Sequence, residues 1–419
     1  MTNRTNPLEL LVLASCVFVL SGAITTLILT PGATAIEGNA IGQVILSISY
    51  LAVGAMLVRY HRETLFLVRR NWTLLAMVIL AFASCLWAET PAFTFRRSVA
   101  VAGTILLGIA LAVRLPLESQ LRMLSWVYRI ISVLSIACVV LLPSYGISSS
   151  AEQGWRGVLS YKNAFGSVMA MSVLVEWQLP VSTRFSRILN WLALLLSAVL
   201  LLFSRSLTPL LALAGAFLLI EIYKFAELRL RMPLYATGLV VLLIFLLGWS
   251  LYVSNDEVIM GALGRSSNFT GRGEIWSWVL SFILERPILG YGYSGFWNAT
   301  AASKAAERAL GAFTMYSHNG YLESLLTLGV VGFLLAVGYL AIGVKRAYYW
   351  SKNGPSPTSL WPLAFLLFFL LYNLGECTIF LQDLQWGIGV GIVAATDPAL
   401  FAPEAEQADE ILEPGEKLA

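Results

Sequence analysis

The stretch LELLVLASCVFVLSGAITTLIL, residues 8–29, decides the fold class of this chain. Its length matches the ~20 apolar residues that a helix needs to cross a ~30 Å hydrocarbon core. The run is longer than a typical signal-peptide core and no small-x-small cleavage signal clearly ends it, so we expect a retained first helix. Lipid offers no partner to a free backbone N–H or C=O, so a run that enters the bilayer must be helical.

Runs of the same kind recur along the whole chain. Spanning helices are expected at roughly 8–30, 40–58, 72–88, 98–114, 122–143, 164–180, 188–204, 207–223, 233–253, 319–343, 358–374 and 378–396. Charged residues make up only 12% of the chain and hydrophobic residues 58%, with a mean hydropathy of +0.77, whereas a soluble domain carries about 25% charged residues. The sequence therefore predicts an all-α polytopic membrane protein of about 12 transmembrane helices with one large periplasmic loop, and it excludes a soluble enzyme.

Lysine and arginine residues lie on alternate connections between these helices. They are Arg59, Arg62, Arg69, Arg70, Arg114, Arg122, Arg184, Arg187, Lys224, Arg229, Arg231, Lys345, Arg346 and Lys352. Cytoplasmic loops carry an excess of Lys and Arg, so these connections and both termini are expected on the cytoplasmic side of a bacterial inner membrane. The expected organisation is N-terminal helices in 1–253, a periplasmic loop region in 254–318, C-terminal helices in 319–396 and an acidic cytoplasmic tail in 397–419.

Three polar residues stand at the outer ends of apolar runs: His318 in SHNGYLES, Arg205 in FSRSLTP and Arg272 in TGRGEIW. An imidazole at the mouth of a helix suits a general base, and a capping role is the alternative for His318. Arg205 is expected either to bind an anionic group or to extend its side chain along the apolar surface to the lipid headgroups. Arg272 is expected to open an external helix, where N–H groups and a guanidinium suit a phosphate, with an ordinary cap or surface charge as the alternative. Glu323 lies about 140° around the helix from His318 and is a poor direct partner for it.

Further positive residues gather on the outer face, where the positive-inside rule predicts few. Arg156 and Lys162 lie in GWRGVLSYKNAFG, and Arg96 and Arg97 lie in WAETPAFTFRRS. This accumulation predicts an anionic ligand at the outer leaflet. No metal site or cofactor is expected, because the chain has only two histidines and its four cysteines form no CxxC pair.

Together these segments resemble the O-antigen ligase and Wzy-type polymerase superfamily of bacterial membrane glycosyltransferases. SHNGYLESLLTLGVVG is similar to the family's His-Asn helix start, which an apolar, Gly-containing helix follows. RGVLSYKNAFG is similar to the Lys-Asn motif of the exopolysaccharide-polymerase (ExoQ-like) branch, which often has histidine where Tyr161 stands. The order and spacing of the motifs, the helix count and the late external loop extend the resemblance over most of the chain.

The resemblance implies a metal-independent, inverting transfer of a glycan from undecaprenyl diphosphate to an acceptor hydroxyl at the periplasmic face. It implies that Arg205 and Arg272 bind the diphosphate and that His318 activates the acceptor. Further expected substrate contacts are Arg156, Lys162, Asn163, Asn319, Arg96 and Arg97. The leading interpretation is a polymerase of exopolysaccharide or O-antigen repeat units, and the alternatives are a ligase that moves the glycan onto lipid A–core and a transporter of lipid-linked glycans. The expected partners are the lipid-linked glycan, the membrane and a chain-length regulator protein, and no nucleic acid.

Overall fold

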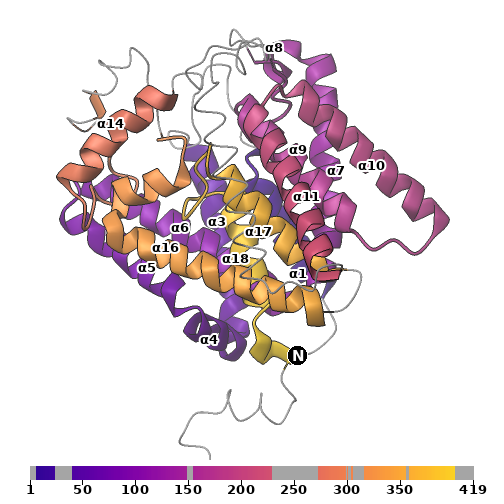
Figure 1. Ribbon diagram of the computed structural model, residues 1–419, viewed down its shortest axis with the longest axis horizontal. Coiled ribbons are helices and arrows are strands. Elements are labelled where there is room, and N and C mark those ends of the chain that lie inside the picture. Colours follow the sequence, from indigo (N-terminus) through magenta and orange to yellow (C-terminus); the bar gives the residue numbers. More distant parts are fainter. Residues whose placement is uncertain are drawn as a thin grey trace, which may run out of the picture.

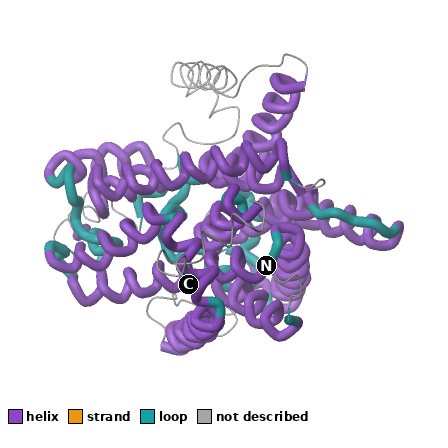
Figure 2. Tube along the Cα trace, turned by 90° about the horizontal axis from the view of Figure 1, so that it is seen from below, coloured by secondary structure: helices purple, strands orange, loops and turns teal. Residues whose placement is uncertain are grey.

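The computed structural model describes residues 6–23, 40–148, 154–228, 272–298, 300, 303–304, 316–354 and 358–401, and these residues form helices and connecting loops without a strand (Figures 1 and 2). The longer helices are α1 (Pro7–Leu20), α3 (Ala40–Arg59), α4 (His61–Arg70), α5 (Trp72–Ala83), α6 (Pro91–Arg114), α7 (Leu117–Leu141), α9 (Lys162–Gln178), α10 (Arg184–Phe203), α11 (Leu207–Leu228), α14 (Arg272–Glu285), α16 (Gly320–Asn353), α17 (Trp361–Tyr372) and α18 (Leu384–Ala395). The short pieces are α8 (Pro143–Gly146) and three 3₁₀ turns, Ser84–Leu86, Thr358–Leu360 and Pro398–Phe401.

The described helices are those of a multi-pass membrane protein. Six of them are long and apolar enough to cross a membrane, and α4 with α5 makes a seventh if this pair, bent by 86°, is counted as one span. The predicted fold class is therefore confirmed. The predicted ninth span, 233–253, lies outside the described residues, as does about half of the predicted periplasmic segment 254–318. The number of 12 spans and the large loop remain predictions.

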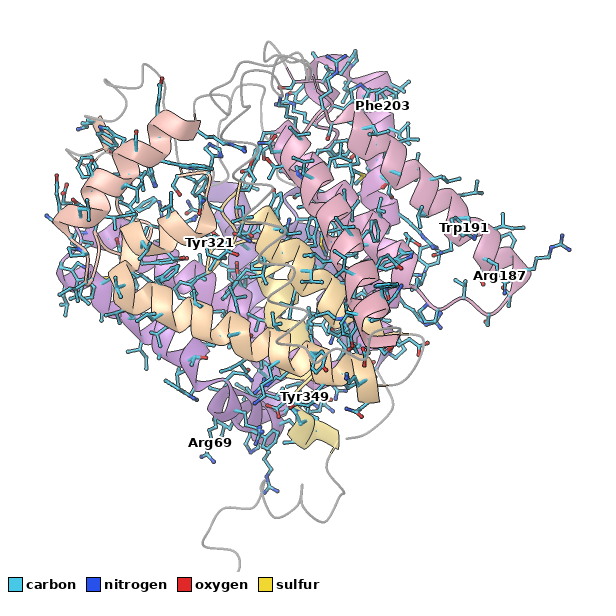
Figure 3. The ribbon with its side chains drawn as sticks, viewed as in Figure 1. Arg69, Arg187, Trp191, Phe203, Tyr321 and Tyr349 are labelled. Carbon is cyan, nitrogen blue, oxygen red and sulfur yellow. The ribbon has the colours of Figure 1, made fainter. Side chains whose placement is uncertain are left out.

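The outer surface of the bundle is apolar where a lipid-facing surface should be. Figure 3 shows α10 at the edge of the molecule, with Phe203 at one end and Arg187 at the other. Trp191, on the same helix, is 58% exposed, and further apolar side chains of α10 are exposed along its length. Packing inside the bundle pairs α18 with α6, α9 with α10, α11 with α17, and α16 with α5.

The last two expected helices are shorter than predicted. The expected ranges 358–374 and 378–396 become α17 and α18, of 12 residues each, because residues 373–383 between them leave the helical path. The Oδ1 of Asn373 accepts the N–H groups of Thr378 and Ile379 at 2.8 and 3.1 Å, and Asp383 caps α18 by accepting the N–H of Gln385 at 2.7 Å. These bonds supply the partners that a helix would otherwise give to the backbone.

The predicted helix at 319–343 is interrupted. In α16 the backbone of Gly329 takes φ 63° and ψ −166°, a conformation essentially restricted to glycine. The carbonyl of Pro287 accepts the N–H of Val330 at 2.8 Å, and the N–H of Tyr291 donates to Leu326 at 3.0 Å. The turn that follows α14 therefore replaces the hydrogen-bond partners that α16 loses at Gly329, and backbone hydrogen bonds fasten this turn to α16.

The start of the expected acidic tail is buried. Asp397 has no exposed side-chain surface and pairs with Arg346 at 2.6 Å and with Arg70 at 2.9 Å. Arg346 also donates to Asn71 Oδ1 at 2.9 Å. This network joins the corner between α4 and α5 to the ends of α16 and α18, because two cations balance one buried carboxylate. Asp397, the first residue of the expected acidic tail, therefore belongs to the packed bundle, and residues 402–419 of that tail lie outside the described part.

We predict that Gly329→Ala lowers the melting temperature of the purified protein in detergent. A Cβ at this position would collide with the Ile288 carbonyl oxygen, and alanine in this backbone region costs of order 1–3 kcal/mol. Gly338→Ala is the matched control, because a Cβ there meets no atom within 4 Å and helical alanine is about 0.5–1 kcal/mol better than glycine. Equal melting temperatures for the two variants would contradict the interrupted helix.

Candidate active site

Glu376, in the loop between α17 and α18, is where four parts of the chain meet. Only 6% of the surface of Glu376 is exposed to solvent. Its Oε1 accepts hydrogen bonds from Arg272 Nη2 at 2.8 Å and from Asn163 Nδ2 at 2.7 Å. Its Oε2 lies 3.3 Å from Nδ1 of His318. A carboxylate with this burial is stable only when paired and hydrogen-bonded, so Glu376 holds α9, α14 and the entry to α16 together.

Backbone bonds fix the loop that carries Glu376 against the start of α16. The N–H of Gly320 donates to the carbonyls of both Asn373 and Glu376 at 2.9 Å. A Cβ on Gly320 would collide with Asn373 Oδ1, so the close approach requires glycine. The N–H of Asn319 donates to Cys377 Sγ at 3.1 Å, and burial raises the pKa of the Cys377 thiol well above its usual range. The thiol is therefore neutral at physiological pH and accepts this bond as part of the scaffold.

Arg272 is the first residue of α14 and faces α11 as well as Glu376. Its Nη1 donates to Thr208 Oγ1 at 3.0 Å, and its side chain is 14% exposed. One turn further along α14, Trp276 Nε1 donates to the carbonyl of Ser317 at 3.0 Å. Residues four apart lie on one face of a helix, so the same face of α14 holds both Glu376 and the residue before His318.

His318 sits in a backbone conformation that side chains rarely adopt, with φ 52°. The helix itself begins at Gly320, and Asn319 is its cap, accepting the N–H groups of Tyr321 and Leu322 at 3.0 and 3.1 Å. The capping role considered for His318 therefore belongs to Asn319. Because a carboxylate only accepts, we assign the imidazole proton to Nδ1, facing Glu376, which leaves Nε2 with its lone pair.

Arg205 lies on the turn between α10 and α11 and is exposed. Its φ is 51°, so Arg205 and His318 are two of the four non-glycine residues with positive φ in the described ranges. Such strain tends to persist at functional sites. The next residue, Ser206, donates its hydroxyl to Asn163 Oδ1 at 2.9 Å, and Asn163 donates to Glu376. The Arg205 turn is thus linked to Glu376 through two hydrogen bonds.

The other positive residues expected at the substrate have different surroundings. Arg156 donates to the carbonyls of Tyr145 and Ser160 and therefore stabilises its own loop. Lys162 begins α9 and is half-buried beside Gly154. Arg96 is exposed on α6 with its guanidinium 5.2 Å from the Phe93 ring, and Arg97 is buried on the same helix. Within the described residues, the hydrogen bonds and ion pairs of the Glu376 carboxylate come instead from Asn163, Arg272 and His318.

Two acidic residues at this end of the bundle have roles that the sequence does not predict. No local motif marks Glu376 in the sequence, and its position as a lone acid between two apolar runs is the one signal that points to it. Glu323 had no assigned role, and the structure shows its carboxylate accepting Trp297 Nε1 at 3.0 Å and the N–H of Ser317 at 2.9 Å. Glu323 therefore anchors the chain that leads into His318, and, as expected, it does not contact that histidine directly.

A family model described as O-antigen ligase matches residues 192–337, a range that includes Arg205, Arg272 and His318. The chain is thus similar to the O-antigen ligase family. It is also 29% identical over 91 residues to the exopolysaccharide production protein ExoQ of Rhizobium meliloti, a match that covers 20% of each chain. The resemblance predicted from the motifs, including its ExoQ-like branch, is confirmed. Glu376 lies beyond the stretch that matches the O-antigen ligase model.

We predict that Glu376→Gln destabilises the fold far more than a Glu→Gln substitution at an exposed ion pair. Removing one partner of a buried ion pair costs about 3–5 kcal/mol, and both partners here are nearly buried. Glu118→Gln is the control, since the Glu118–Arg122 pair is about half exposed and such pairs contribute ~0–1 kcal/mol. The readout is thermal unfolding in detergent.

The double variant Glu376→Gln/Arg272→Gln should recover part of the lost melting temperature, because it leaves no uncompensated buried charge. If Glu376→Gln unfolds at the same temperature as Glu118→Gln, the ion pair does not organise this end of the bundle.

Proposed function

We propose that the protein is a membrane glycosyltransferase that moves a glycan from undecaprenyl diphosphate to an acceptor sugar hydroxyl at the periplasmic face of the inner membrane. The acceptor is another lipid-linked glycan, so the enzyme is a polymerase of exopolysaccharide or O-antigen repeat units. The observation that carries the proposal is the contact of Glu376 with both Arg272 and His318. One carboxylate thereby brings a cation for the leaving group next to a base for the acceptor.

The donor side of the site has to stabilise charge on the departing diphosphate. A guanidinium has five N–H donors, and the described contacts of Arg272 use one for Thr208 and one for Glu376. The remaining three can bind phosphate oxygens while the ion pair persists. At ~4 Å and an effective dielectric of ~20, one such charge pair contributes up to about 4 kcal/mol before desolvation. Arg205, on its exposed turn, supplies the second guanidinium, so the proposed chemistry is metal-independent.

The acceptor side has to remove a proton as the new bond forms. The acceptor oxygen attacks the anomeric carbon and gives its proton to His318 Nε2, while the bond to the diphosphate oxygen breaks and the diphosphate leaves with the electron pair. A single displacement of this kind inverts the anomeric configuration. Glu376, beside Nδ1, favours the imidazolium that forms and keeps the ring in the productive tautomer.

The two matches favour different acceptors. The Rhizobium meliloti relative is named for exopolysaccharide production, which supports the polymerase together with the Lys-Asn segment around Asn163. The family model is named for O-antigen ligase, which supports transfer to lipid A–core as the second candidate. A chain-length regulator is the partner protein that the polymerase implies.

The acceptor distinguishes these candidates in a reconstituted assay. Purified protein in vesicles, given only lipid-linked repeat units, should build a ladder of longer lipid-linked chains on a gel. If product forms only after lipid A–core is added, the ligase is the correct function. If neither acceptor is extended and the lipid-linked glycan instead crosses the vesicle membrane, the protein is a transporter and the enzyme proposal fails.

The arginine and histidine roles are tested in the same assay. We predict that Arg272→Ala lowers the transfer rate by ~10²–10³, as loss of one preorganised hydrogen-bond donor does. Arg272→Lys should restore only part of the rate, because a lysine ammonium lacks the planar, paired N–H donors of the guanidinium. His318→Ala should cost ~10²–10⁴. Arg122→Ala, on the exposed surface of α7, is the control and should transfer at the wild-type rate.

Transfer by the wild type should persist in excess EDTA. Activity that disappears with EDTA and returns with Mg²⁺ or Mn²⁺ would refute the metal-independent mechanism. Wild-type rates from Arg272→Ala or His318→Ala would refute the corresponding role.

A further inference from the structure

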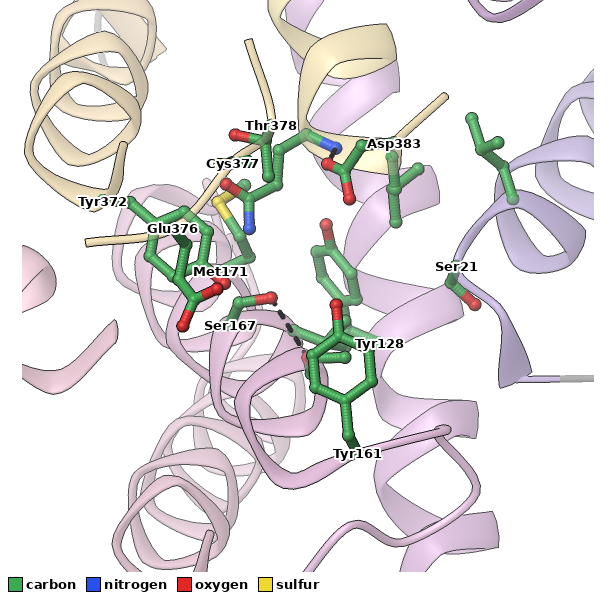
Figure 4. A pocket seen from close by; sticks show the side chains of 15 residues that line it. Ser21, Tyr128, Tyr161, Ser167, Met171, Tyr372, Glu376, Cys377, Thr378 and Asp383 are labelled. Atoms are coloured by element: carbon green, nitrogen blue, oxygen red, sulfur yellow. Dashed lines mark hydrogen bonds between the residues drawn. The ribbon is translucent and has the colours of Figure 1, made fainter. Parts of the chain in front are cut away.

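The cavity beside Glu376 is too small for a substrate. It lies between the end of α1, the helices α7 and α9, and the segment 372–385 (Figure 4). Its volume is about 60 Å³, whereas small-molecule sites measure ~300–1,000 Å³. It has room for a few water molecules and none for a sugar ring. The exposed charged surface of the bundle therefore offers the better place for a further ligand.

Helix α4 lies at the surface of the membrane-spanning bundle, where α3 ends and α5 begins (Figure 1). α3 is long and apolar enough to cross a membrane, and it ends at Arg59. The chain then bends by 86° between α4 and the next apolar stretch, Trp72–Leu86. On that stretch Leu75 and Ile79 are exposed one turn apart, as lipid-facing side chains are. Because α5 points into the bilayer, α4 lies along the membrane surface.

One face of α4 combines two arginines with an apolar side chain. Arg62, Leu65 and Arg69 are spaced by three and four residues, so they share this face. All three are exposed, Leu65 to 50%, and Figure 3 shows Arg69 at the lower edge of the bundle. Three residues further, Trp72 opens α5 and is 61% exposed. Glu63, the only acidic residue of α4, is half-buried, so this face is positive beside apolar area.

The opposite side of α4 is held by the buried network around Asp397. Leu67 is fully buried, and Arg70 pairs with Asp397 at 2.9 Å. Asn71, directly after the helix, accepts a hydrogen bond from Arg346 at 2.9 Å. The arginines of the exposed face are therefore presented by a fixed element, and binding through them loses less conformational freedom than binding through a loose loop.

These features fit the headgroup of an anionic phospholipid. Guanidinium groups bind phosphate oxygens through paired N–H donors, and tryptophan is favoured at the level of the headgroups. A soluble anion would use the arginines but leave Leu65 and Trp72 in water, whereas a lipid covers them with its acyl chains. Arg62 and Arg69 are seven residues apart, about 10 Å along the helix, so each can hold the phosphate of a separate lipid.

We propose that α4 is a binding site for anionic phospholipids, in which Arg62 and Arg69 hold headgroup phosphates while Leu65 and Trp72 insert among the acyl chains. Four arginines lie within residues 59–70, and clusters of this size directly beside a spanning helix attract anionic lipid. Bound lipid fastens the corner that carries the Asp397 network to the membrane surface. The site is independent of the proposed glycan transfer.

Quenching of a label on α4 by brominated lipids tests the site. Leu65→Cys in the full-length protein, carrying the fluorophore bimane, is placed in nanodiscs of phosphatidylglycerol and phosphatidylcholine, with bromine on the acyl chains of one lipid at a time. The wild type carries four cysteines, so wild-type protein labelled in parallel gives the background. At equal mole fraction, brominated phosphatidylglycerol should quench the label more strongly than brominated phosphatidylcholine, because the arginines enrich the anionic lipid.

Arg62→Ala/Arg69→Ala, made in the labelled protein, should remove most of this preference. Each arginine at an anionic surface favours binding about fivefold, so loss of both should lower the enrichment by roughly an order of magnitude. Arg122→Ala/Lys224→Ala is the matched control, because it removes the same charge from side chains that already pair with a glutamate of their own helix at 2.7 Å. The control should keep the wild-type preference.

Melting temperatures separate lipid binding from a contact within the protein. A lipid that binds only the folded state raises the melting temperature. The protein without the label should therefore melt higher in phosphatidylglycerol nanodiscs than in phosphatidylcholine nanodiscs, and Arg62→Ala/Arg69→Ala should lose most of that difference. A variant destabilised equally in both lipids would show that the arginines bind another part of the chain, and it would overturn the proposal. Equal quenching by the two brominated lipids, or a preference that survives without the arginines, would overturn it as well.

Discussion

A buried carboxylate at Glu376 is the constraint around which this end of the bundle is organised. Removing such a group from water is unfavourable unless hydrogen bonds and opposite charge replace the solvent. Glu376 obtains them from Arg272, Asn163 and His318. These donors come from α14, from the start of α9 and from the segment before α16, so satisfying one charge fixes the relative positions of three distant parts of the chain.

The helices of this end of the bundle are interrupted, and the interruption between α17 and α18 carries the residue at the centre of the site. The backbone leaves the helical path at Gly329 and between α17 and α18, and in both places other groups of the protein supply the missing hydrogen-bond partners. The turn after α14 forms hydrogen bonds with the backbone groups left free in α16, and the side chain of Asn373 does the same in the loop that carries Glu376. A continuous pair of helices would leave no loop for Glu376 and no cavity beside it. The irregular segments therefore carry the polar chemistry, and the regular helices provide a rigid frame.

Much of the fold could be predicted because the bilayer imposes simple rules on length and polarity. Most of the expected apolar runs that lie in the described residues became helices with shifts of a few residues. The interruption at Gly329 and the short α17 and α18 could not be predicted, because they depend on side-chain and backbone partners far away in the sequence. Arg272, His318 and Asn163 were identified from local motifs, whereas Glu376 has no local motif and acquires its importance from contacts across more than fifty residues.

The central claim is that Glu376 and His318 act as one unit, and a double-mutant cycle on the transfer rate tests it most directly. Residues that act together are strongly non-additive: once one is lost, removing the other costs little more. The rates to compare are those of wild type, Glu376→Gln, His318→Gln and the double variant, all measured on protein shown to be folded. The account predicts that the double variant is no slower than the slower single variant. Rate losses that multiply would show that the two residues work independently and would contradict it.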